Sequence, residues 1–167
     1  MTHLIVHHAL LWGLGLSAFL TVAFMALGIS NPEMWLNDYP PDIRKQFGPM
    51  SPKANRQRWL LGVPLMIVTL GVIALATIHF AERAPVPAGF TAVFAHTLIL
   101  LMVFNVVDLL IIDWLFFVRI QPRFVILPGT EGLAGYSDYA FHWRAFLKGT
   151  AGILVFSVVV GGLVAIL

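Results

Sequence analysis

Histidine side chains are the most versatile chemical groups in this sequence, which has six of them and no cysteine. Neutral imidazole is a common ligand of transition metals and of haem iron. His3 and His7 are four residues apart, so both rings would lie on one helical face, as a chelating pair requires. The candidates for a metal or haem site near the outer ends of three predicted helices are His3, His7, His8, His79 and His96.

Acidic side chains inside a predicted membrane segment form a second candidate site. Asp108 lies near the middle of the third apolar segment, where an ionised carboxylate is unfavourable unless it is paired or wetted. On an α-helix Asn105 lies about 60° from Asp108 and shares its face, whereas Asp113 lies about 140° away and does not. Asn105 and Asp108 therefore suggest either a proton or ion pathway or an interhelical clamp. Asp113 is expected to form an inner-interface salt bridge with Arg119, Arg144 or Lys148.

A mixed cluster of aromatic and charged residues, Tyr136 to Arg144, precedes the last apolar segment. Such a mixture is suited to binding an anion or a lipid head group, and an aromatic belt at the membrane interface explains the same residues. The candidates for inner-face binding are Arg119, Arg123, Tyr139, His142 and Arg144.

No sequence motif identifies a reaction. The turn-rich segment Leu127 to Gly132 matches neither the phosphate-binding glycine loop nor the dinucleotide fingerprint, and the chain has no GxSxG or HExxH motif. Without cysteine, disulfides, thiolate metal sites and thiol catalysis are excluded. Enzymatic activity is left open, and haem or a transition metal is the only cofactor that these residues suggest.

The elements that position these groups are membrane helices. The chain is 59% hydrophobic and 11% charged, against about 25% charged residues in soluble domains, and its mean hydropathy is +0.89. These values exclude a soluble globular protein. A span needs about 20 apolar residues, so we expect one all-α domain over residues 1–167, an integral membrane four-helix bundle with helices at about 4–27, 59–80, 91–117 and 146–167.

The basic residues predict the orientation of this bundle. Nine of the ten Lys and Arg residues fall in the long segments after the first and third helices, and cytoplasmic loops are enriched in such residues. Both termini are therefore predicted outside, with two long cytoplasmic loops, in the bacterial inner (plasma) membrane. A net charge of +2 gives no reason to expect a nucleic-acid partner.

Small residues recur at four-residue spacing in the first and last helices. Helices in lipid associate through close contacts between small residues, so both stripes should face protein. Four helices leave little interior, so a homo-oligomer or a larger membrane complex is expected besides the lipid bilayer. The similarity of His8-Ala-Leu-Leu to His96-Thr-Leu-Ile suggests a duplicated helical hairpin. The two stripes are Gly13, Ser17 and Thr21, and Ser157, Gly161 and Ala165.

Three classes of function follow from these residues. The leading hypothesis is a redox-related membrane protein that binds a metal or haem through the outer histidines. The second is a small proton-coupled carrier or channel that uses Asp108. The third is a non-catalytic subunit or assembly factor of a larger membrane complex.

Overall fold

All regular structure in the part of the chain that the computed structural model describes, residues 1–166, is helical. Four helical segments are long and apolar enough to cross a membrane, as predicted: Thr2–Ser30, Pro52–Arg83, Phe90–Ile120 and Tyr139–Val164. The elements in chain order are α1 (Thr2–Ser30), the 3-10 helix η1 (Pro32–Asp38), α2 (Pro41–Phe47), α3 (Pro52–Arg83), α4 (Phe90–Val107), the π-helix η2 (Asp108–Ile120), the 3-10 helix η3 (Ala134–Ser137) and α5 (Tyr139–Ile166).

The membrane helices extend beyond their predicted apolar cores because capping residues start them earlier. The Ser51 hydroxyl accepts a hydrogen bond from the Ala54 amide at 3.2 Å, and Pro52 occupies the first turn of α3. The Asp138 carboxylate likewise accepts from the Phe141 amide at 2.8 Å where α5 begins. Hydropathy shows only the lipid-crossing part of each helix, so both starts were predicted several residues too late. The predicted final residue, Leu167, lies outside the described residues.

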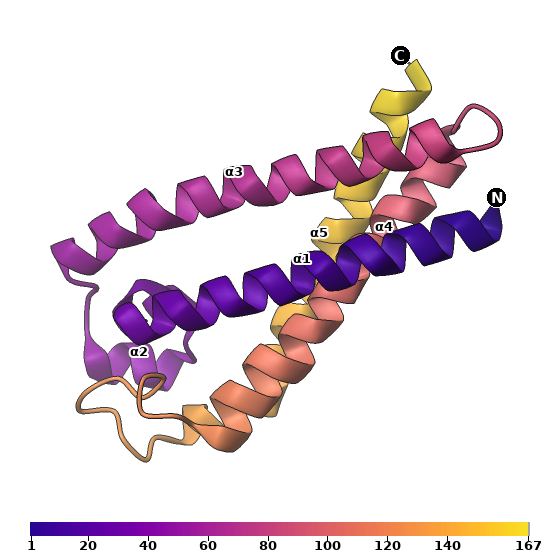
Figure 1. Ribbon diagram of the computed structural model, residues 1–167. Helices are drawn as coiled ribbons and strands as arrows, with labels where there is room; N and C mark the ends of the chain where they lie inside the picture. The colour runs from indigo at the N-terminus through magenta and orange to yellow at the C-terminus, as the bar shows by residue number, and fades with distance from the viewer. Residues whose placement is uncertain (167) are drawn as a thin grey trace.

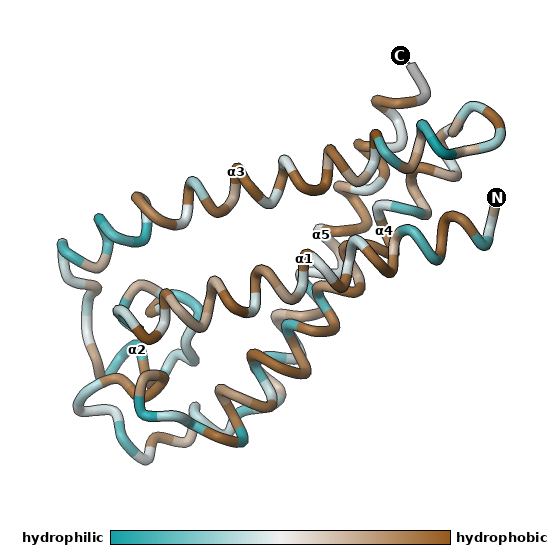
Figure 2. The backbone as a smooth tube through the Cα atoms, in the orientation of Figure 1, coloured by the Kyte–Doolittle hydropathy of each residue, from teal (hydrophilic) through white to brown (hydrophobic). Residues whose placement is uncertain are grey.

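The helices form a bundle in which α4 is the central element (Figure 1). It packs along α5 and crosses α1, whereas α3 contacts the others sparsely. Polar segments gather at the two ends of the bundle (Figure 2). We call the end with the segments 31–51 and 121–138 the loop end, and the opposite end, with the α3–α4 turn, the turn end.

Small residues allow close helix contacts, as the sequence predicts. A Cβ atom at Gly13 would lie 2.8 Å from the Leu100 carbonyl oxygen on α4, and one at Gly161 would lie 3.1 Å from Phe90. Ser17 and Ser157 on the same two stripes are buried. Both stripes therefore face protein in the same chain, except that the side chain of Ala165 lies outside the described part.

The two long loops fold together over the loop end. The Tyr39 hydroxyl donates to the Val125 carbonyl oxygen at 2.8 Å, and the Gly135 amide donates to the Asp42 carboxylate at 2.8 Å. A small apolar core holds them together, formed by Leu36, Tyr39, Ile43, Leu127 and Tyr136. We call this assembly of residues 31–51 and 121–138 the loop cap.

The third membrane helix changes from α to π geometry at Asp108. In the π-helix each amide bonds to the carbonyl five residues earlier, as the Gln121 amide does to the Phe116 oxygen at 2.9 Å. Most π-helices are single turns, and they occur frequently at functional sites. The sequence predicted an uninterrupted α-helix here. The positions around the helix axis that we expected for residues after Asp108, at 100° per residue, therefore do not hold.

Candidate functional site

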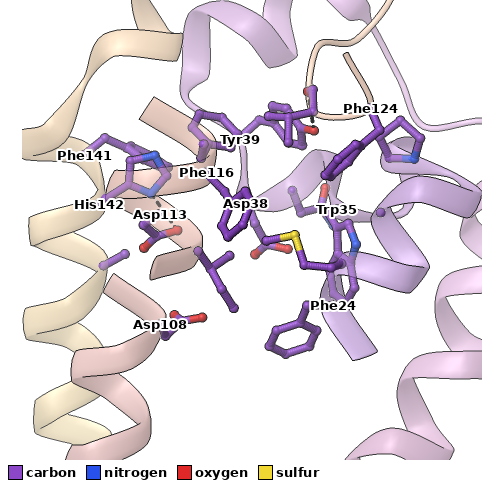
Figure 3. A pocket seen from close by; sticks show the side chains of 18 residues that line it. Phe24, Trp35, Asp38, Tyr39, Asp108, Asp113, Phe116, Phe124, Phe141 and His142 are labelled. Carbon is purple, nitrogen blue, oxygen red and sulfur yellow. Dashed lines mark hydrogen bonds and ion pairs between the residues drawn. The ribbon is translucent and has the colours of Figure 1, made fainter. Parts of the chain in front are cut away.

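A cavity of about 480 Å³ lies beneath the loop cap, between α1, η1, η2 and α5. Figure 3 shows its lining side chains, which include three carboxylates and one imidazole. The carboxylates belong to Asp38, Asp108 and Asp113, and the imidazole belongs to His142. We call this cavity the acid pocket, and it is the main candidate site in the described residues.

The π-helix brings Asp108 and Asp113 into the same cavity. The two residues are five apart, and the wider turn of a π-helix, with its i→i+5 hydrogen bonds, brings such residues closer to one face than an α-helix does. Both carboxylates line the acid pocket. The prediction that they occupy different helix faces was wrong because it assumed 100° per residue, the value for an α-helix.

Asp113 pairs with His142 on α5. The Nδ1 atom of His142 lies 3.0 Å from the Asp113 carboxylate, and the His142 side chain is only 4% exposed. Its buried Nε2 atom has no hydrogen-bond partner among residues 1–166. Asp113 thus connects its helix to the start of the last one, as expected, but the partner is not Arg119, Arg144 or Lys148. Arg144 instead lies 3.7 Å from Asp138 in an exposed pair.

Asp38, at the end of η1, is the pocket residue that sequence reasoning missed. It lies at the exposed rim of the acid pocket. Desolvation by the surrounding protein raises the pKa of its carboxyl group, Arg58 opposes this rise, and the charge of Asp113 adds to it. The residue lies in a loop whose position depends on long-range contacts, so no local sequence pattern indicated it.

Aromatic side chains form most of the apolar wall of the acid pocket. Trp35 and Tyr39 come from the loop cap, whereas Phe24 comes from α1 (Figure 3). Trp35 also has a buried indole N–H without a hydrogen-bond partner in the described chain. Neither Lys nor Arg is among the lining residues described, so the pocket combines negative charge with aromatic faces.

Asn105 forms a clamp between helices and is not among the lining residues of the acid pocket. Its amide nitrogen donates to the Phe146 carbonyl oxygen at 3.2 Å and to the Thr150 hydroxyl at 3.0 Å, both on α5. A Cβ atom at Gly149 would lie 2.8 Å from the Asn105 oxygen, so the glycine makes room for this contact. The sequence suggested either a proton or ion pathway or an interhelical clamp for Asn105 and Asp108. The contacts of Asn105 fit the interhelical clamp.

Three of the predicted histidines meet at the turn end. His8 Nδ1 lies 2.9 Å from His96 Nε2, and His8 Nε2 lies 2.9 Å from His79 Nδ1. The three rings come from α1, α3 and α4 and form what we call the histidine chain. His3 and His7 stack on each other at 5.9 Å between ring centroids, on an exposed part of α1.

This arrangement does not support the predicted metal or haem site. Both nitrogens of His8 are occupied by the neighbouring imidazoles, so the three rings do not converge on one point. The direct contacts of 2.9 Å also leave no room for a porphyrin between the rings. In residues 1–166 no group of three His, Asp or Glu side chains is arranged to hold a metal ion.

The predicted inner-face cluster is divided by the fold. His142 is buried in the acid pocket, whereas its four proposed partners are exposed. Tyr139 contacts the edge of Trp114, with ring centroids 5.5 Å apart. The exposed members are Arg119, Arg123, Tyr139 and Arg144, and their binding of an anion or a head group stays a prediction.

Comparison with known proteins adds no functional assignment to this geometry. No family model matches the chain, and neither a curated protein nor a solved structure is significantly similar to it.

Proposed function

We propose that this protein is a small proton-coupled carrier of organic cations and that the acid pocket is its binding site. The observation that carries the proposal is the presence of three carboxylates and His142 in one aromatic-walled cavity. A cationic ligand offsets the carboxylate charges. Aromatic faces attract the same charge through cation–π interactions of about 0.5–2 kcal/mol.

The size and lining of the acid pocket favour an organic ligand. Small-molecule sites usually have volumes of about 300–1,000 Å³ and mostly apolar walls, and this cavity has about 480 Å³. A bare metal ion needs several ligand atoms around one point, an arrangement that is not found in residues 1–166. The ligand that fits best is an amine or quaternary cation with apolar groups.

Protons and the cation would compete for the same carboxylates. A carboxyl group in a poorly solvated site binds a proton more readily than it does in water, and a neighbouring positive charge displaces that proton. The raised pKa of Asp38 at the pocket rim follows this rule. Cation binding on the loop side, which we predict to be cytoplasmic, would therefore release protons, and the reverse exchange would complete a transport cycle.

Binding of tetraphenylphosphonium tests the pocket directly. We expect saturable binding to the purified full-length protein, with no matching affinity for tetraphenylborate, which has the same shape and the opposite charge. Asp108→Asn and Asp113→Asn should each weaken binding by about tenfold or more, equivalent to about 1.4 kcal/mol per tenfold. Glu82→Gln, which changes an exposed acid at the turn end, is the control and should have no effect.

Transport is tested in proteoliposomes. A pH gradient should drive accumulation of tetraphenylphosphonium, and Asp108→Asn should abolish the protein-dependent part while the variant remains folded. Equal binding of tetraphenylborate, or unchanged exchange in the Asp108 variant, would contradict the proposal.

A further inference from the structure

His142 has one ring nitrogen without a partner at the wall of the acid pocket. Its side chain is 4% exposed, and its Nδ1 atom lies 3.0 Å from the Asp113 carboxylate (Figure 3). Its Nε2 atom is buried and has no hydrogen-bond partner in the described residues. Buried polar atoms of this kind are rare in folded proteins and call for an explanation. At the wall of a cavity, a ligand can supply the missing partner.

The contact with Asp113 determines which nitrogen of His142 carries hydrogen. An ionised carboxylate only accepts hydrogen bonds, so the Nδ1 atom of His142 donates in this contact. A neutral imidazole has one donor nitrogen and one acceptor nitrogen, and the Nε2 atom is then the acceptor. A cation in the pocket repels an imidazolium, so the neutral ring is the form that binds it. The unpaired Nε2 atom therefore requires a donor from the ligand.

We propose that the acid pocket selects cations that carry an N–H group, which are protonated primary, secondary and tertiary amines, over quaternary cations of similar size. This inference rests on the proposed function, because it names the class of organic cation that the acid pocket binds. The N–H group of the ligand donates to His142 Nε2, while Asp38 and Asp108 offset its charge. Tetraphenylphosphonium has no N–H group and binds through charge and aromatic contacts alone.

Neighbouring side chains hold the imidazole of His142 in position for this bond. Phe117 contacts the ring edge to face, with centroids 4.8 Å apart, and Phe141 does the same at 5.3 Å. The bond to Asp113 fixes the rotation of the ring about its own axis. A group that is already fixed loses little conformational freedom when a ligand binds. The Nε2 atom is therefore a preorganised acceptor.

The burial of the Nε2 atom makes the selection strong. Most hydrogen bonds add little to affinity because each one replaces bonds to water. The Nε2 atom has no partner in the described chain, so a ligand N–H that reaches it adds a bond without breaking one within the protein. The bond is also strengthened by the positive charge of the donor. A quaternary cation gains no such bond and leaves the acceptor unpaired.

Two ligands of equal charge test the selection. Benzyldimethylammonium and benzyltrimethylammonium differ only in that a methyl group replaces the N–H hydrogen, and both carry one positive charge at neutral pH. Each is titrated into the full-length protein, with displacement of bound tetraphenylphosphonium as the measurement. In the wild type we expect benzyldimethylammonium to bind about tenfold or more tightly than benzyltrimethylammonium.

His142→Asn separates the acceptor from the contact with Asp113. The shorter amide keeps a donor near the position of Nδ1 and removes the Nε2 acceptor. The ratio of the two affinities should fall by about tenfold, whereas a general loss of packing would weaken both ligands and leave their ratio unchanged. The hydration of the ligands is the same with either protein, so the change in the ratio reports on Nε2. His7→Asn, at an exposed position of α1, is the matched control and should keep the wild-type ratio.

A measurement on the wild type guards against misfolding of the His142 variant. In solid-state NMR with nitrogen-labelled histidine, the Nε2 resonance of His142 should move when benzyldimethylammonium is added and stay in place with benzyltrimethylammonium. Equal affinity of the two ligands for the wild type, or an unchanged ratio in His142→Asn, would overturn the inference. If tetraphenylphosphonium still binds in that case, the acid pocket remains a cation site and only its selectivity is refuted. Absence of binding by all three cations would contradict the proposed function as well.

Discussion

The Nδ1 atom of His142 lies 3.0 Å from the Asp113 carboxylate and joins the first turns of α5 to the π-helix. The contact orients Asp113 toward a ring that is itself fixed against Phe117, at a centroid distance of 4.8 Å. It leaves the Nε2 atom of His142 as a buried group without a partner in residues 1–166. The pair therefore both holds the loop end together and presents a polar atom beside the acid pocket.

Replacing His142 should change both the free energy of unfolding and the affinity for tetraphenylphosphonium, because it removes the His142–Asp113 pair. His142→Phe leaves Asp113 without its partner, and we expect a loss of about 1.5–3 kcal/mol, the range for hydrogen bonds to charged groups. Thermal unfolding in detergent and tetraphenylphosphonium titration would measure the two effects. Arg144→Gln removes the exposed 3.7 Å pair with Asp138 and should change stability by at most about 1 kcal/mol. Equal effects of the two substitutions would refute the role of the buried pair.

Cation affinity should increase with pH. The pKa of Asp38 is raised above its ordinary value in the folded protein, so its proton competes with a cation below that raised pKa and leaves above it. Titration of tetraphenylphosphonium across acidic to neutral pH should show this increase, and Asp38→Asn should flatten it. Because Arg58 lowers the pKa of Asp38, Arg58→Gln should move the increase to higher pH. A shift to lower pH would contradict the assignment.

Gly13 should be far less tolerant of substitution than Gly15 on the same helix. A Cβ atom at Gly13 would lie 2.9 Å from the Val103 Cβ atom, whereas one at Gly15 would have no neighbour within 4 Å. Gly13→Ala should destabilise the α1–α4 contact by about 1–3 kcal/mol through overpacking. Gly15→Ala should be neutral or slightly stabilising, because alanine favours the helix. Thermal unfolding of both variants tests the difference, and equal midpoints would disprove the close contact.

The Tyr136 hydroxyl should be necessary for the order of the loop cap. It accepts a hydrogen bond from the Leu127 amide at 2.9 Å and lies 2.7 Å from the Thr130 hydroxyl. Tyr136→Phe leaves the buried Leu127 amide unpaired, whereas the Thr130 hydroxyl keeps its bond to the Leu127 carbonyl oxygen at 2.7 Å. We therefore expect a loss of about 1–3 kcal/mol and faster amide hydrogen exchange in residues 121–138. Tyr139→Phe, at an exposed position, should leave the exchange unchanged.

The sequence was sufficient to predict four helices that are long and apolar enough to cross a membrane, and it also predicted the small-residue contacts. Both depend on local composition, and Gly13 and Ser17 occupy buried positions as expected. The common depth of His8, His79 and His96 also followed from helix order. That His8 bonds to both other rings depends on the rotation of three helices about their axes, which apolar segments of similar composition do not encode clearly. The duplicated hairpin, the orientation, an oligomer and a role in a larger complex stay predictions.

The acid pocket could not be predicted because it depends on geometry that hydropathy does not report. Asp38 reaches it through the fold of the loop cap, which long-range contacts such as Tyr39 to Val125 define. Asp113 reaches it because the helix widens to π geometry after Val107. Their charge identified Asp108 and Asp113 as unusual residues in an apolar segment. The α-helical spacing, however, placed Asp113 on a different helix face from Asp108, and both residues line the acid pocket.

The sparse packing of α3 leaves it joined to the rest of the fold mainly near its two ends. Its buried residues lie near its ends, with Ala54 at one end and Ile73 to Phe80 at the other. Asn31 also donates to Gln57 at 2.6 Å. An apolar groove of about 290 Å³ runs along α1 from Leu11 to Phe19 and reaches α3 at Val72. Acyl chains would fill this groove in a bilayer, so their length and saturation should set how stiffly α3 couples the loop cap to His79.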